Sequence, residues 1–315
     1  MKKNLIALAV AGALVVPMTA AANVTIYGSL QQELVHVDDG TNKSFVVAEA
    51  QSGASTVATA AGGGSGPSTL GFRATHDLGN GMKATADYSL NPDTQAQRNA
   101  YVNLDTGTAG TIWIGRMGGP YNTSGKDVLH ATFMQARGNG GMRDPGGIGG
   151  TEVSNTVAYS NKFGPVSLVG GLIVDETASS DHGHAVRAEM NMGDIAVWVA
   201  NASANGAATN TASKIGAAYT MGDLRLMGQY EVVESGAQEG SFMLGQVSYK
   251  MGANTLAGSY GRFSEDGAGA DTTYMALGVV HSFSRAVRAH AGYRVTDVDG
   301  VNKFSAFGAG LRVGF

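Results

Sequence analysis

The last twelve residues, Phe304–Phe315, constrain the fold more than any other segment. Every second residue from Phe307 to Phe315 is apolar, and the positions between them carry glycine or Arg312. Side chains alternate across a β-strand, so one face is apolar and the other is small or charged. A strand ending on an exposed phenylalanine is a poor edge in water. It suits a strand that faces lipid on one side and a water-filled lumen on the other, although a soluble sandwich could show the same alternation.

The N-terminus has the pattern of a secretory leader. Lys2 and Lys3 precede the apolar run Leu5–Val16, which is too short to span a bilayer at roughly 20 residues. The small residues Ala20–Ala22 then form a cleavage pattern. We expect a signal peptide over residues 1–22 and a mature chain from Asn23; an uncleaved membrane anchor is the alternative. The mature chain would carry 19 basic and 25 acidic residues, a net charge of −6.

Composition narrows the class of protein further. There is no cysteine, so no disulfide or thiolate–metal framework can form. The 47 glycines among 315 residues are roughly twice the usual share of about 7%, which suits many strands joined by tight turns. After the leader, no apolar run is long enough for a transmembrane helix. Charge is too sparse for a nucleic-acid-binding surface.

Segments of about ten residues with alternating polarity recur along the chain, as expected for membrane strands. In Gly81–Leu90, for example, Met82 and Tyr88 share one face, while Lys83 and Asp87 share the other. The clearest segments are Thr69–Leu78, Gly81–Leu90, Ala185–Met192, Lys214–Met221, Leu224–Val232 and Val287–Val295.

The connections alternate between short turns and longer polar loops. Seven short turns, several built on Asn-Gly or Gly-Asp pairs, and eight longer loops imply sixteen strands. This asymmetry is typical of outer-membrane barrels. We therefore predict an all-β protein in which residues 23–315 form a 16-stranded antiparallel transmembrane β-barrel. The loops 38–66 and 117–152 are the longest.

Two segments break the alternation. On Ala96–Leu104, Arg98 shares its parity with apolar residues, and on Thr111–Arg116, Arg116 does the same. A β-bulge or a wall covered by protein would explain either exception.

Charged residues at lumen parity are the main functional signal, because a charge facing lipid at the bilayer midplane costs about 2–4 kcal/mol. The acidic residues at this parity are Asp87, Glu189 and Glu231, with Asp77 near a rim. The basic residues are Arg73, Lys83, Arg187, Lys214, Arg225, Arg288, Arg294 and Arg312. They are either the polar lining that any wet lumen needs or an excess of positive charge that sets ion selectivity.

Signals for catalysis or metal binding are weak. No nucleophile motif stands beside a histidine. His182 and His184 are close together, but no cluster of carboxylates or thiolates supports a metal site. We expect no enzymatic activity, no metal and no cofactor.

Several motifs resemble the trimeric general porins of beta- and gammaproteobacteria, and the resemblance extends over essentially the whole mature chain. Asn23–Gly28 is similar to their first strand, and Phe315 is their usual final residue. Other matching segments are Leu70–Arg73, Trp113–Arg116 and Asn155–Gly164.

The resemblance implies a homotrimer of 16-stranded barrels with a third loop that folds inward and narrows the pore. The segment 117–152 occupies the place of that loop. Its Arg143–Gly147 differs from the family's Pro-Glu-Phe-Gly-Gly tip, so the acidic half of the constriction does not transfer directly. Arg98 and Arg116 match basic positions of the family, and Arg73 is close to one.

We therefore predict an outer-membrane porin for passive diffusion of small hydrophilic solutes and ions. A substrate-selective channel, or a surface adhesin or phage-receptor barrel, is the alternative. Expected partners are outer-membrane lipid, two further copies of the chain, and the barrel-assembly machinery through Phe315. The residues expected at the constriction and lumen are Arg73, Lys83, Arg98, Arg116, Asp127, Arg137, Arg143, Asp144, Arg288, Arg294 and Arg312.

Overall fold

The computed structural model describes residues 22–48, 68–125, 127–136, 152–174, 182–204, 210–235, 238–266, 270–301 and 303–315. The strands are β1 (Asn23–Asp38), β2 (Lys43–Ala48), β3 (Thr69–Gly79), β4 (Met82–Leu90), β5 (Gln97–Asp105), β6 (Thr111–Met117), β7 (Val153–Phe163), β8 (Val166–Ile173), β9 (Gly183–Met192), β10 (Ile195–Ala204), β11 (Asn210–Met221), β12 (Leu224–Ser235), β13 (Gln238–Met251), β14 (Asn254–Glu265), β15 (Thr272–Ser282), β16 (Val287–Val298) and β17 (Phe304–Gly314). A short 3₁₀ turn, η1 (Gly107–Ala109), joins β5 to β6.

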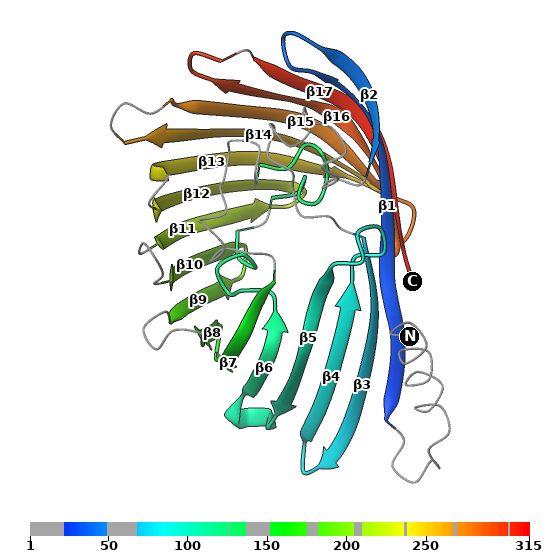
Figure 1. The fold of residues 1–315 in the computed structure, drawn as a ribbon, viewed down its shortest axis with the longest axis vertical. Helices are drawn as coiled ribbons and strands as arrows, with labels where there is room; N and C mark the ends of the chain where they lie inside the picture. Colours follow the sequence, from blue (N-terminus) through cyan, green and yellow to red (C-terminus); the bar gives the residue numbers. More distant parts are fainter. Residues whose placement is uncertain are drawn as a thin grey trace, which may run out of the picture.

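The strands form one closed antiparallel barrel (Figure 1). From β3 onward each strand pairs with the next in sequence, and β1 pairs with both β3 and β17, which closes a wall of 16 strands. The backbone of Phe315 exchanges hydrogen bonds of 2.9 and 3.0 Å with Gly28 at this seam. The predicted barrel and its strand number are confirmed. No described helix is long and apolar enough to cross a membrane.

The remaining strand, β2, lies in the segment 38–66 that the sequence suggested was only a loop. It pairs with Glu33–Asp38 of β1, which follow the stretch Asn23–Ser29 that pairs with β3. Lys43 and Asp38 form a 3.1 Å ion pair at the hairpin turn. The first long connection therefore begins as a hairpin that extends the wall.

The outer face of the wall is apolar, as the alternation predicts. Val24, Leu277 and Phe315 are more than half exposed, although they are large and apolar. The alternate residues point inward, where Gln31, Asp87 and Glu231 are buried. An apolar outer band around a polar interior is the pattern that a lipid bilayer requires.

Two bulges lie beside the predicted irregularities. Tyr88 pairs with Ala100 while Leu90 pairs with Gln97, so β5 has an extra residue next to Arg98. Gly115 pairs with Thr156 while Met117 pairs with Val153, so β7 has an extra residue opposite Arg116. A bulge interrupts the two-residue period of its own strand, which explains why parity fails at Arg98. At Arg116 the extra residue is in the partner strand β7, so the bulge marks an irregular pairing beside Arg116 but does not shift the parity of β6.

The third loop runs inside the barrel after β6, where Figure 1 draws its first part as a green tube within the ring of strands. Leu129 and Met134 of this loop are fully buried. They pack with Trp198, Leu244 and other inward side chains of the wall. The largest hydrophobic cluster of the described residues therefore lies between the loop and the barrel wall.

Candidate functional site: the lumen and its inward loop

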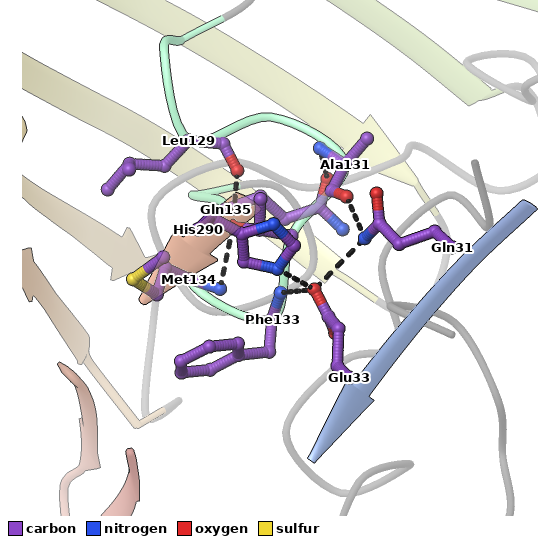
Figure 2. Close-up of polar contacts among 9 residues, drawn as sticks. Gln31, Glu33, Leu129, Ala131, Phe133, Met134, Gln135 and His290 are labelled. Atoms are coloured by element: carbon purple, nitrogen blue, oxygen red, sulfur yellow. Dashed lines mark hydrogen bonds and ion pairs between the residues drawn. The ribbon is translucent and has the colours of Figure 1, made fainter. Parts of the chain in front are cut away.

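The tip of the inward loop is attached to the wall through Glu33 of β1 (Figure 2). One carboxylate oxygen, Oε1, accepts hydrogen bonds from His290 Nε2 of β16 at 2.6 Å and from the Phe133 backbone N–H at 3.1 Å. Gln31 Nε2 donates to the same oxygen at 3.0 Å and to the Ala131 carbonyl at 2.7 Å. The side chains of Glu33 and His290 are almost completely buried. Breaking such a buried pair by removing one partner is strongly destabilising.

A glycine makes room for this contact. A side chain at Gly310 of β17 would place its Cβ 2.5 Å from His290 Nε2 and 2.6 Å from Glu33 Cγ. Real Cβ atoms do not approach other atoms so closely. Some of the glycines of the wall therefore serve to admit the loop and its anchors.

Further contacts hold the loop along the wall from β11 to β15. Lys214 Nζ donates to the Ser124 carbonyl at 3.1 Å, and the Val128 N–H donates to Gln246 Oε1 at 2.9 Å. Two buried tyrosine hydroxyls add hydrogen bonds, from Tyr121 to Glu231 and from Tyr274 to the Met134 carbonyl. The described part of the loop is thus fixed to the wall at several points between residues 121 and 134.

Asp127 acts within the loop. Its carboxylate accepts a hydrogen bond from the Ala136 N–H at 3.2 Å, across nine residues of chain. Burial raises the pKa of the Asp127 carboxyl to about 6, and the backbone hydrogen bonds only partly offset this effect. Asp127 therefore ties the two ends of the loop tip together.

Arginines gather on the wall formed by β16, β17, β3 and β5. Arg288 and Arg312 are direct cross-strand partners, and Arg312 donates to Ser29 Oγ at 3.0 Å. Arg98 also lies within electrostatic reach of Arg312. Like charges directly opposite each other destabilise a sheet, so the pairing of Arg288 with Arg312 costs stability. The same pairing concentrates positive potential on this part of the lumen wall.

Two of the predicted arginines are neutralised locally. Arg98 Nε lies 2.9 Å from Glu152 Oε1, and its Nη1 donates to the Ser68 carbonyl. Arg73 Nε lies 2.8 Å from Asp87 Oδ2. The other carboxylate oxygen of Asp87, Oδ1, accepts a hydrogen bond from the Tyr27 hydroxyl. Among the described residues, Arg288 and Arg312 form no ion pair.

The other predicted residues lie apart from this arginine wall. Arg116 donates to the Gln97 carbonyl and to Ser154 Oγ at the ends of β5 and β7. Arg294 is buried and lies 5.8 Å from the ring of Phe304. Lys83 stands opposite Asp77 and Asp105 near the β3–β4 turn. Arg137, Arg143 and Asp144 lie outside the described residues.

Sequence reasoning missed the loop anchors Glu33, Gln31, Tyr121 and Tyr274. Lumen parity would have placed Glu33 and Gln31 on the inner face of β1, but no local signal pairs Glu33 with His290, 257 residues away. Among the described residues, no group of three or more possible metal ligands comes together.

Comparison with solved structures finds the same architecture in several bacterial porins. The anion-selective porin of Comamonas acidovorans superposes with a TM-score of 0.74 at 19% identity, over 94% of this chain and 100% of that one. The trimer form of OmpT, an outer-membrane protein of Vibrio cholerae, gives 0.69 at 18% identity, over 94% and 100%. A triple mutant of the Rhodopseudomonas blastica porin gives 0.66 at 18% identity, over 93% and 100%. No curated protein sequence matches the chain.

A closed barrel with an apolar outer band and a charged lumen defines the class of outer-membrane channels. The sequence profile of the Gram-negative porins matches residues 7–301, so the chain belongs to the Gram-negative porin family. It is an outer-membrane porin that forms a channel.

Proposed function

We propose that the channel passes small hydrophilic solutes by passive diffusion, with a weak preference for anions. The observation that carries this proposal is the Arg288–Arg312 pair, two guanidinium groups side by side without an ion pair among the described residues. Confinement in a lumen strengthens their effect on passing ions, whereas loop charges are screened over about 8–10 Å at ordinary salt. The fold shared with a porin described as anion-selective is consistent with the proposal.

The inward loop would set the size limit, since it occupies the side of the lumen from β11 to β16. Ion pairs on the wall, such as Arg73 with Asp87 and Arg98 with Glu152, would orient water in the remaining gap and make passage costly for apolar solutes. We place Arg73, Arg98 and Arg312 on the wall side of this gap. We assign no catalysis and no cofactor to the channel.

Reversal potentials in a potassium chloride gradient test the selectivity. Wild-type channels should prefer chloride at low salt, and the preference should fall as salt rises. The double variant Arg288→Gln/Arg312→Gln should lose most of it. Arg262→Gln is the matched control, because Arg262 pairs with Asp271 at 2.6 Å at the rim. A cation preference of the wild type at low salt would show that carboxylates control the pore.

We also infer a homotrimer, with β1 and β3–β6 at the contact. The outer face there carries the small pair Ala74 and Ala86 in register and the polar residues Gln32 and His76, which suit a protein neighbour better than lipid.

We further propose that residues 1–22 are removed on export and that the barrel-assembly machinery recognises Phe315. Mass spectrometry of the exported chain should find Asn23 first.

A further inference from the structure

A second lumenal feature lies apart from the arginine wall. An alcove of about 660 Å³ opens between the root of the inward loop and the wall of β5–β9. Its lining includes Tyr101, Trp113, Pro120, Lys162, Ser167 and Arg187. Pockets that hold small ligands have volumes of about 300–1,000 Å³, so the alcove is large enough for a monosaccharide with water around it.

Two aromatic rings form one side of the alcove. The rings of Tyr101 and Trp113 meet edge to face, with centroids 5.1 Å apart and an interplanar angle of 63°. Trp113 Nε1 donates to Ser160 Oγ at 2.9 Å, which fixes the indole against β7. A fixed aromatic surface suits the apolar C–H face of a sugar ring, because it offers large contact area with little loss of conformational freedom.

Cationic donors stand on the other side. Arg187 is held by Thr123 Oγ1 of the loop root, 2.6 Å from its Nη1. Its Nε is buried and has no hydrogen-bond partner in the structure. Arg187 Nη1 also forms a long ion pair with Glu189 Oε1, at 3.9 Å. A buried donor without a partner carries a desolvation cost that an incoming acceptor would remove.

The lining also offers hydrogen-bonding groups that the fold does not use. The ammonium of Lys162 and the hydroxyl of Ser167 form no hydrogen bond or ion pair with another described side chain. Asn161, in contrast, is occupied by Tyr159 and the Thr108 carbonyl. Aromatic surface, free hydroxyl and cationic donors therefore converge on one cavity.

We propose that this alcove is a binding subsite for sugar acids, monosaccharides that carry a carboxylate. The ring would stack on Trp113, the carboxylate would accept from the Arg187 guanidinium and the Lys162 ammonium, and a hydroxyl would meet Ser167. Charge-assisted hydrogen bonds to the carboxylate would give the site its preference over neutral sugars. The subsite rests on the proposed diffusion pore and makes it selective for one class of solute.

Intrinsic fluorescence tests binding, because the chain contains only two tryptophans. Titration with galacturonate should give a saturable change that persists in Trp198→Phe and disappears in Trp113→Phe. Galactose lacks the carboxylate and acetate lacks the sugar ring, so each should bind at least about tenfold more weakly than galacturonate. A linear response, or equal responses to all three, would overturn the proposal.

Single-channel recording separates this subsite from the pore itself. Galacturonate should cause brief blocks of the wild-type current, and Arg187→Gln and Tyr101→Leu should shorten or abolish them. Arg262→Gln should leave the blocks unchanged. If the double variant of Arg288 and Arg312 loses anion preference but keeps the blocks, the two sites are independent. Blocks that survive both alcove substitutions would place the sugar acid elsewhere.

Discussion

At the scale of single residues, the buried carboxylates differ in what they do. Glu33 accepts three hydrogen bonds, so its oxygen joins two strands and the loop tip. Asp127 instead binds the backbone of its own loop. The wall arginines Arg288 and Arg312 form no ion pair among the described residues, and in the proposed function they interact with passing ions. Position within the lumen, and not residue type, decides which charges hold the structure and which face the pore.

Asp127 should make the loop tip sensitive to pH. Its folded pKa of about 6 lies above the ordinary value of 3.8, so the docked loop binds the proton more tightly than the undocked loop. Docking should therefore strengthen as pH falls through 6, and the gain should level off below about 4. Hydrogen exchange of the amides of residues 127–136 measures this effect.

Asp127→Asn provides the control for that experiment, because it resembles the protonated form at every pH and cancels the intrinsic pH dependence of exchange. At pH 7.5 the variant should be better protected than wild type, and at pH 3.5, below both pKa values of Asp127, the two should converge. A constant difference at both pH values would contradict the assignment.

At the scale of elements, the described part of the inward loop contains no helix or strand, and contacts with several strands of the barrel hold it in place. Its anchors come from β1, β11, β13, β15 and β16. The bulges in β5 and β7 stand beside its two roots and turn the chain there. The loop position therefore depends on the register of distant strands.

Glu33→Gln should loosen the loop tip. The amide keeps the shape of the side chain, but it removes the charge that three donors share, and a hydrogen bond to a charged group contributes about 1.5–3 kcal/mol. We expect noisier open-channel current and faster proteolysis within the loop, with folding of the barrel retained. Glu239→Gln, at an exposed position of β13, should change neither. A quiet channel with an intact loop in Glu33→Gln would show that the other anchors suffice.

At the scale of the whole molecule, closure of the barrel removes every edge strand from the wall, and the outer face then has to meet either lipid or protein. The face of β9–β14 exposes large apolar residues such as Ile215, Met243 and Tyr260. The face of β1 and β3–β5 also exposes large apolar residues such as Val24 and Leu34, but it adds the small Ala74–Ala86 pair and the polar residues Gln32 and His76. The trimer proposal uses these small and polar residues.

Ala86→Trp should weaken the trimer, because the indole would project from the small Ala74–Ala86 pair into the space that the neighbouring chain would occupy. Ala188→Trp adds the same group on β9, where lipid can adapt. Electrophoresis without heating should show an SDS-resistant species of three chains for wild type and Ala188→Trp, and monomers for Ala86→Trp. Equal behaviour of both variants would move the interface elsewhere.

Local sequence pattern determined much of this protein. Alternation of period two established the wall, the turns established its strand number, and parity identified Arg73, Arg288 and Arg312 as inward-facing, because these features depend on neighbouring residues alone. Only the tertiary structure decided the β2 hairpin, the bulge that displaces Arg98, the opposition of Arg288 to Arg312 and the meeting of Glu33 with His290. Each of these depends on strand register or loop docking across long separations in sequence, and no local period encodes such pairings.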